Sequence, residues 1–236
     1  MEKTSVVTGA ASGVGQAVSL KLVQNGWRVA IVGRSAAKLE QTLRMAGTQA
    51  AAMVPVECDV SDSDAVSRAG SRVMEHFGRI DLLVNSAGTN VPKRSLAELS
   101  LEDYRKMMTS NLDGAYYWTQ AVLPAMRAQG CGTIVNIVSD AGKLASPKAG
   151  PAYVMSKFGL AGLTQSTNAE ERARGIRACA IFPGDINTPI LDKRPTAPDA
   201  VAREKMLQPD DVAECVMLCV NLPLRAIVEE LMIRPR

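Results

Sequence analysis

A tyrosine and a lysine stand four residues apart in the stretch "YVMSK", as Tyr153 and Lys157. Residues at positions i and i+4 of a helix share one face, so the two side chains can meet if this stretch is helical. A phenol has a pKa of about 10, and a neighbouring ammonium lowers that pKa because it stabilises the phenolate. The pair could therefore be a proton donor with its activating cation. It could also be an ordinary helical surface, since this spacing occurs in many soluble helices.

A second chemical pattern follows the first apolar run. In "VTGAASGVGQAV", Gly9, Gly13 and Gly15 have the spacing TGxxxGxG. Glycine lets the backbone turn sharply, and it lets a phosphate approach the N-terminus of the next helix closely. The spacing departs from the commoner GxGxxG pattern, and a tight strand-to-helix turn needs glycine in any case. Its place between the first expected strand and helix favours dinucleotide binding.

The end of the second expected strand, "IVGRS", bears on which dinucleotide would bind. In NAD-binding versions of such a fold, a carboxylate about 20 residues past the glycines accepts hydrogen bonds from the ribose hydroxyls. Here Gly33 is followed by Arg34 and Ser35, so no acid would repel a 2′-phosphate. A guanidinium can pair with that phosphate, whereas the alternative is a solvated surface arginine. The sequence favours NADP(H) over NAD(H).

The elements that must position these groups alternate along the chain. Short apolar or β-branched runs alternate with amphipathic stretches, and near-continuous apolar runs are typical of parallel strands covered on both faces. A β-α-β-α order implies right-handed crossovers. We therefore expect an α/β fold over residues 1–236: a single-domain, Rossmann-type, doubly wound parallel sheet of about seven strands with helices on both faces. The expected strands are residues 5–9, 28–33, 51–59, 81–85, 132–139, 176–183 and 228–234.

One region has neither a strand nor a helix pattern. Residues 186–200, "INTPILDKRPTAPDA", are rich in proline and charge. The segment could be a disordered linker, but within a compact α/β domain a long loop after a strand is more often a lid over a site. We expect a substrate loop at about residues 185–205.

Composition argues against several function classes. The net charge is +3, and without a block of basic residues no nucleic-acid partner is expected. No apolar window of about 18 residues exists and no signal peptide is evident, so no membrane partner is expected. Five cysteines without a zinc-like spacing indicate a reduced, cytoplasmic protein. The single histidine, His76, argues against a Ser-His-Asp hydrolase, and no metal site is expected.

Taken together, the motifs resemble those of the short-chain dehydrogenases/reductases, in their most widespread subgroup. The resemblance covers nearly the whole chain, and the segments occur in the family's order. Any one of them could arise by chance, but seven in order are very unlike chance. They are "TGAASGVG" (8–15), "CDV" (58–60), "NSAG" (85–88), "NLDG" (111–114), "NIVSDAG" (136–142), "YVMSK" (153–157) and "FPGDINT" (182–188). The sequence departs from the family at Ser86, which replaces an asparagine, and in its last residues, "VEELMIRPR".

The resemblance implies a role for each matched residue. It implies that Tyr153 is the general acid/base, that Ser139 hydrogen-bonds the substrate oxygen, and that Lys157 also binds the nicotinamide ribose. It implies that Asn111 holds a water that continues the proton relay, so the expected catalytic residues are Asn111, Ser139, Tyr153 and Lys157. The expected cofactor-binding residues are Gly9, Ser12, Gly13, Val14, Gly15, Arg34, Ser35, Asp59, Val60, Asn85, Ala87, Gly88, Tyr153, Lys157, Pro183, Gly184, Ile186 and Thr188.

Several of these residues also have a purely structural interpretation. Ser139 could cap the end of its strand, and Asn111 could bond neighbouring backbone. Asp59 could be a turn or N-cap acid. Asp140 and Lys143 lie in the loop that lines the substrate pocket in the family, and we assign neither a catalytic role.

The function implied is that of an NADP(H)-dependent oxidoreductase, a carbonyl reductase or alcohol dehydrogenase that interconverts a small carbonyl compound and its alcohol by hydride transfer. Two alternatives stay open: a non-catalytic cofactor-binding regulator or scaffold, and an epimerase-type relative that uses bound nicotinamide transiently. The resemblance also implies a homodimer or homotetramer through helices at 101–129 and 152–173. Their apolar faces could instead belong to the domain's own core. The sequence does not identify the substrate.

Overall fold

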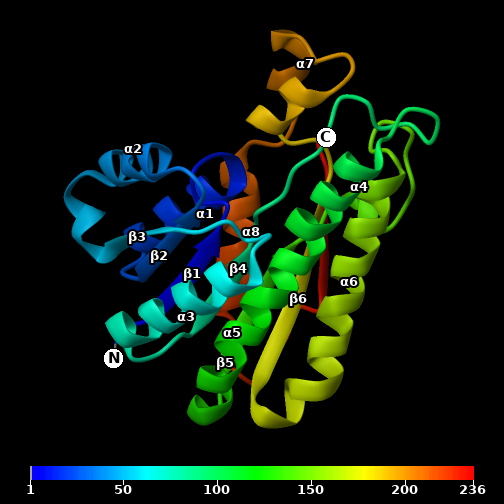
Figure 1. Ribbon diagram of the computed structural model, residues 1–236. Helices are drawn as coiled ribbons and strands as arrows, with labels where there is room; N and C mark the ends of the chain where they lie inside the picture. Colours follow the sequence, from blue (N-terminus) through cyan, green and yellow to red (C-terminus); the bar gives the residue numbers. More distant parts are fainter. Residues whose placement is uncertain (1) are drawn as a thin grey trace.

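The computed structural model describes residues 2–236, so Met1 of the expected domain lies outside the described residues. Within residues 2–236, seven strands form one parallel sheet in the order β3-β2-β1-β4-β5-β6-β7. The chain winds outward from β1 in one direction and then returns to wind outward from β4 in the other, and helices cover both faces (Figure 1). The expected α/β, doubly wound fold is confirmed.

The strands follow the expected apolar runs, with differences at their ends. β2 and β6 have the expected bounds, β1 is shifted by one residue toward the N-terminus, and β3, β4, β5 and β7 are shorter than expected. The central strands are buried along their whole length, but β3 and β7 alternate between buried or half-buried and exposed residues because they form the sheet edges. The strands are β1 (Thr4–Thr8), β2 (Arg28–Gly33), β3 (Met53–Glu57), β4 (Leu82–Asn85), β5 (Gly132–Ile137), β6 (Ile176–Pro183) and β7 (Glu230–Ile233).

Two helical layers enclose the sheet. One layer holds α1 (Gly13–Gln24), α2 (Ala36–Ala46) and α8 (Pro209–Asn221). The other holds α3 (Ser63–Phe77), α5 (Gly114–Gln129) and α6 (Pro151–Glu171). Shorter helical segments are η1 (Gly47–Ala52), α4 (Leu101–Met108), η2 (Thr109–Asp113), η3 (Asp140–Gly142), η4 (Arg172–Arg174), η5 (Pro189–Lys193) and α7 (Ala200–Glu204). No helix formed by residues 2–236 is both long and apolar enough to cross a bilayer.

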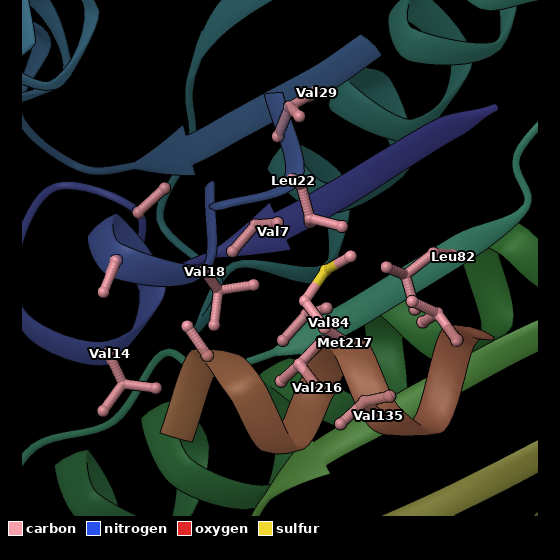
Figure 2. Packing of buried hydrophobic residues seen from close by; sticks show 14 of the residues in the cluster. Val7, Val14, Val18, Leu22, Val29, Leu82, Val84, Val135, Val216 and Met217 are labelled. Carbon is pink, nitrogen blue, oxygen red and sulfur yellow. The ribbon is translucent and has the colours of Figure 1, made fainter. Parts of the chain in front are cut away.

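The larger core lies between the sheet and the layer of α1 and α8. Figure 2 shows Val18 and Leu22 of α1 and Val216 of α8 directed toward sheet residues such as Val7 and Val84. All five side chains are buried. Burying a side chain of this kind stabilises the fold by about 1.5–3 kcal/mol, so this layer holds the first strand and its glycine turn in place.

Two expected elements differ from the structure. The helix expected at 101–129 is divided, because a π-helical segment, Thr109–Asp113, separates α4 from α5. The buried Asn111 lies in the middle of this segment, and its side chain bonds to another loop as described below. Residues 186–200, expected to be without regular structure, contain the short helix Pro189–Lys193 and the first residue of α7. The Asp199 carboxylate caps α7 by accepting a hydrogen bond from the Ala202 amide at 2.8 Å.

Candidate active site

The glycine turn and the "NSAG" segment meet at the carboxyl ends of β1 and β4. The Thr8 hydroxyl accepts hydrogen bonds from the amides of Ser86 and Ala87, both at 3.1 Å. Gly9 has a φ of 68°, and a Cβ on it would stand 2.9 Å from the Ala87 Cα. A Cβ on Gly15 would stand 2.5 Å from the Gly9 oxygen. Glycine is therefore required at both positions by backbone contact, and these segments form one tight wall.

The N-terminus of α1 is open to an anion. Ser12 is its N-cap but makes no side-chain capping bond, and the first turn contains no acidic residue. The first amides of a helix lack internal partners, and together with the helix dipole they attract a phosphate. Val14 is buried beneath the turn, and the Thr188 methyl lies 3.2 Å from the position that a Cβ on Gly13 would occupy. The residues of the turn thus fit a bound phosphate group, with Thr188 of the substrate loop facing them.

Arg34 and Asp59 lie beside each other at the end of β2 and just beyond β3. Their charged groups are 3.9 Å apart, and both side chains are largely exposed. The Asp59 carboxylate also accepts a hydrogen bond from the Ser61 amide at 3.0 Å, as a turn residue would. Ser35 caps α2 by accepting from the Lys38 amide at 3.4 Å. Val60 is buried against Gly114 at the start of α5.

Tyr153 and Lys157 lie one turn apart near the start of α6, as the spacing predicts. The Lys157 ammonium is 5.6 Å from the centre of the Tyr153 ring and donates a hydrogen bond to the Ile137 carbonyl at 2.9 Å. Lys157 is buried, and burial lowers its pKa to about 8. Burial is also the largest influence on Tyr153, and it raises the pKa of that hydroxyl. We expected a lowered pKa from the lysine; in the structure, burial of the phenol outweighs the influences that lower it.

Four other residues act on Tyr153. The Ser139 hydroxyl lowers the pKa of Tyr153, as do the charges of Arg194 and Arg94, whereas Asp140 raises it. The Ser139 hydroxyl accepts from the Ala141 backbone amide at 3.1 Å and donates to the Asp140 carboxylate at 3.2 Å, so Ser139 caps the turn after β5. Ser139 has a φ of 156°, and among residues 2–236 it is the single non-glycine residue with a positive φ.

Asn111 lies against the same centre through the loop that follows β4. Its Oδ1 accepts from the Thr89 amide at 2.7 Å, and its Nδ2 donates to the Thr89 carbonyl at 2.9 Å. A Cβ on Gly88 would stand 3.5 Å from Asn111 Oδ1 and 3.8 Å from the Lys157 Nζ, so Gly88 lies between these two groups. The Asn111 side chain thus bonds backbone, as its structural interpretation expects, but this backbone is that of Thr89 rather than of its own helix.

The remaining expected residues line the same end of the sheet. Asn85, at the end of β4, is buried and donates to the Asn136 side chain at 2.9 Å. Pro183 ends β6, and the Gly184 amide bonds the Ile233 carbonyl at 2.8 Å. Ile186 pairs with Leu207 in an isolated bridge. The expected residues therefore lie along the carboxyl end of the sheet, from Arg34 beside β2 and β3 to Ser139 and Tyr153 beside β5.

Sequence reasoning missed three cations that the fold brings to this end of the sheet. Arg94, in the loop after β4, and Arg194, in the substrate loop, both act on the pKa of Tyr153. The Lys193 ammonium donates to the Thr89 hydroxyl at 2.7 Å. All three lie in polar segments that resemble ordinary surface loops, and no local spacing distinguishes them.

Comparisons with known proteins show the family of this chain. The family model for the short chain dehydrogenase matches residues 3–199. An uncharacterized oxidoreductase of Staphylococcus epidermidis is 31% identical over 234 residues, which is 99% of this chain and 97% of that protein.

Two solved structures are similar over the whole chain. An alcohol dehydrogenase from the archaeon Thermococcus sibiricus, complexed with 5-hydroxy-NADP, has a TM-score of 0.89 and 31% identity, covering 100% of this chain and 97% of that one. A metagenomic short-chain oxidoreductase in complex with NADP has a TM-score of 0.85 and 32% identity, covering 99% and 97%. The family match and the relative of the same length lead to one conclusion: this chain belongs to the short-chain dehydrogenase family of oxidoreductases.

Proposed function

We propose that this protein is an NADP(H)-dependent oxidoreductase that interconverts a small carbonyl compound and its alcohol, with Tyr153 as the general acid/base. One observation carries the proposal. Tyr153 lies near Ser139, whose hydroxyl lowers its pKa, and one helical turn from the buried Lys157, at the same carboxyl end of the sheet as the open N-terminus of α1. Hydride transfer to a carbonyl requires a proton donor near a site that holds the phosphates of the nicotinamide cofactor, and both lie at this end of the sheet.

The chain's own residues would divide the reaction as follows. Bound nicotinamide supplies or accepts the hydride. The glycine turn and the first amides of α1 hold the phosphates. Ser139 donates a hydrogen bond to the substrate oxygen as charge develops there. Tyr153 gives its proton to that oxygen during reduction and removes it during oxidation, and Lys157 stabilises the phenolate that reduction leaves.

A cluster of cations supports the preference for NADP(H). Burial lowers the pKa of Lys193, and so do the charges of Lys106, Arg34 and Lys38, so three cations act on this ammonium. The ion pair of Arg34 with Asp59 is long and exposed, and such pairs contribute about 0–1 kcal/mol, so Arg34 can turn to a 2′-phosphate at little cost. Both similar solved structures contain NADP or its derivative.

Exposed apolar side chains and free cysteines support the expected assembly and location. Tyr116 on α5 and Met155 and Phe158 on α6 are large apolar side chains that remain exposed. They support association of two or four copies through these helices. Among the described residues all five cysteines are free, which supports a reducing, cytoplasmic location.

The proposal is tested by NADPH oxidation with a panel of small ketones, β-keto esters and quinones. NADH and Tyr153→Phe are measured alongside, and Tyr104→Phe is the matched control because Tyr104 packs in the same small cluster as Tyr153. Turnover should fall by about 10²–10⁴-fold in Tyr153→Phe and be retained in Tyr104→Phe. Tight NADPH binding without turnover on any substrate would favour a regulator or scaffold. Conversion without net NADPH consumption would favour an epimerase.

A further inference from the structure

Arg94 is a buried arginine that bonds three loops at once. Its side chain is 5% exposed, and its Nε donates to the carbonyl of Val91, in its own loop after β4, at 2.6 Å. Its Nη1 donates at 3.1 Å to the carbonyl of Lys148, in the loop between Ser139 and Tyr153. Its Nη2 donates to the carbonyl of Lys193, at the end of the helix in the substrate loop. The three loops that surround Tyr153 therefore converge on one guanidinium.

The loop after β4 makes further bonds to the same two neighbours. The Thr89 hydroxyl accepts from the Lys193 ammonium at 2.7 Å, and the Asn90 side-chain Nδ2 donates to the Ala149 carbonyl at 3.0 Å. Lys193 is thus held twice, by its carbonyl and by its ammonium. We call the contacts of Thr89 and Arg94 with Lys193 the latch.

The chemistry of Arg94 suits this task and no simpler side chain does. A guanidinium is a planar fork of five N–H donors, whereas an ammonium is a point charge on a flexible stem. A buried charge is costly unless it is hydrogen-bonded, and here each of the three guanidinium nitrogens donates to a backbone carbonyl. Burial lowers the pKa of Arg94, as does the charge of Arg194, whereas Tyr153 raises it. The three acceptors of the guanidinium are neutral carbonyls, so they hold its positive charge beside the site without cancelling it.

Arg94 also lies against the start of the helix that carries Tyr153. A Cβ on Gly150, the N-cap of α6, would stand 2.5 Å from the Arg94 carbonyl oxygen and 2.8 Å from the Arg94 Cβ. A movement of Arg94 would therefore displace Gly150, which lies three residues before Tyr153. The next residue after the latched Lys193 is Arg194, which pairs with Asp185 at the start of the substrate loop.

We propose that Arg94 is a positioning residue that, together with Thr89, latches the substrate loop at Lys193 and so places Arg194 beside Tyr153. The catalytic consequence rests on the proposed function, but the latch itself does not. With the latch intact, Arg94 and Arg194 both favour the phenolate of Tyr153, against Asp140, while the Lys157 ammonium lies near its ring. When the latch opens, Arg194 moves away and the pocket loses the wall that the substrate loop provides.

Hydrogen exchange tests the latch in the full chain, with and without NADPH. The amides of Leu191 and Arg194 are bonded within the substrate loop, to the carbonyls of Thr188 and Leu191 at 3.1 and 3.0 Å. In Arg94→Lys and in Thr89→Val, these amides should exchange at least about tenfold faster than in the wild type, because each variant removes a bond to Lys193. Thr89→Val removes a single hydroxyl, so it serves if Arg94→Lys fails to fold.

Arg177 offers a matched control. It is 8% exposed, and it also donates to three backbone carbonyls, those of Pro223, Ala226 and Leu222. It lies near the amino end of β6, at the opposite end of the strand from the site. Arg177→Lys should lower the melting temperature without changing exchange at Leu191 and Arg194. Unchanged exchange in both latch variants, or equal acceleration in Arg177→Lys, would overturn the proposal.

Steady-state kinetics then distinguish a positioning role of Arg94 from a general loss of stability. The latch variants should raise the KM of the carbonyl substrate by about tenfold with a smaller change in kcat. The pH above which reduction is lost should also move upward, because Tyr153 loses the nearby charge that lowers its pKa. Arg177→Lys should show neither effect. If hydrogen exchange accelerates in the latch variants but the wild type turns over no substrate, the latch is supported and the proposed function fails. If the wild type turns over substrate but exchange is unchanged in both latch variants, the proposed function is supported and the latch fails.

Discussion

The side chain of Asn111 and the backbone of Thr89 form two hydrogen bonds in opposite directions, at 2.7 and 2.9 Å. Asn111 is 1% exposed, and it lies in the π-helical segment between α4 and α5. A π-helical turn widens the helix locally and often occurs at functional sites. Here the widened turn directs the amide to the loop after β4, so the helix distortion and the loop that latches Lys193 depend on each other.

Asn111→Asp should destabilise the protein by about 2–4 kcal/mol at pH 7. The substitution replaces the donor to the Thr89 carbonyl with an oxygen and buries an unpaired charge. Urea denaturation measures the loss. Asn25→Asp is the control, because the Asn25 side chain also donates to a backbone carbonyl, that of Lys21 at 2.8 Å, but in an exposed position. A similar loss in both variants would show that the buried pair has no special weight.

Gly9→Ala should be far more damaging than Gly26→Ala, although both glycines have a positive φ, 68° and 78°. The backbone strain is common to both and costs about 1–2 kcal/mol. The Cβ at position 9 would additionally press on Ala87 at 2.9 Å, whereas the Cβ at position 26 meets nothing within 4 Å. We expect a melting temperature lower by several degrees more in Gly9→Ala, together with loss of NADPH binding by calorimetry. Equal melting temperatures would contradict the contact of Gly9 with Ala87.

Lys157→Met should stabilise the cofactor-free protein while abolishing turnover. Burial lowers the pKa of Lys157 from 10.5 to about 8, and a shift of about 2.5 units corresponds to roughly 3 kcal/mol. Below about pH 8 the lysine is charged in both the folded and unfolded states, so the cost of the buried charge is fully present. Between about pH 8 and 10.5 the folded state loses its proton first, and wild-type stability rises toward that of the variant.

Thermal unfolding from pH 6 to 10.5 measures this effect. The variant should have the larger free energy of unfolding at pH 7, by about 2–3 kcal/mol, and its advantage should shrink above pH 8. Lys21→Met is the control, since Lys21 pairs with Glu214 and its pKa is raised, so no such gain is expected. A pH-independent difference would mean that Lys157 is not held as a buried charge.

Arg34→Leu should weaken NADPH binding by about 10–100-fold and leave NADH binding unchanged. A hydrogen bond to a charged group contributes about 1.5–3 kcal/mol, and NADH lacks the 2′-phosphate that would accept it. Calorimetry with both cofactors gives the ratio. Arg44→Leu, near the end of α2, is the control for removal of a positive charge. Equal weakening for NADPH and NADH would assign Arg34 to another part of the cofactor.

The amino-acid sequence by itself determined the fold class and the position of most strands. Apolar runs such as 28–33 and 176–183 coincide with β2 and β6, because a strand buried on both faces needs apolar residues throughout its length. The turn at Gly9 and the one-turn spacing of Tyr153 and Lys157 are also local properties, since they depend on a single turn or helix. For the same reason the family could be identified before the structure was known.

Only the tertiary structure decided how the loops around Tyr153 are joined. Asn111 bonds a residue 22 positions away, and Arg94 bonds carbonyls 54 and 99 positions away. No local pattern predicts such partners, because the residues that flank Asn111 and Arg94 in the sequence carry no information about which distant carbonyl or amide each will bond. The raised pKa of Tyr153 is likewise invisible in "YVMSK", since it results from burial by segments distant in the chain. The sequence specified which groups could do chemistry, and long-range packing decided which of them meet at the carboxyl end of the sheet.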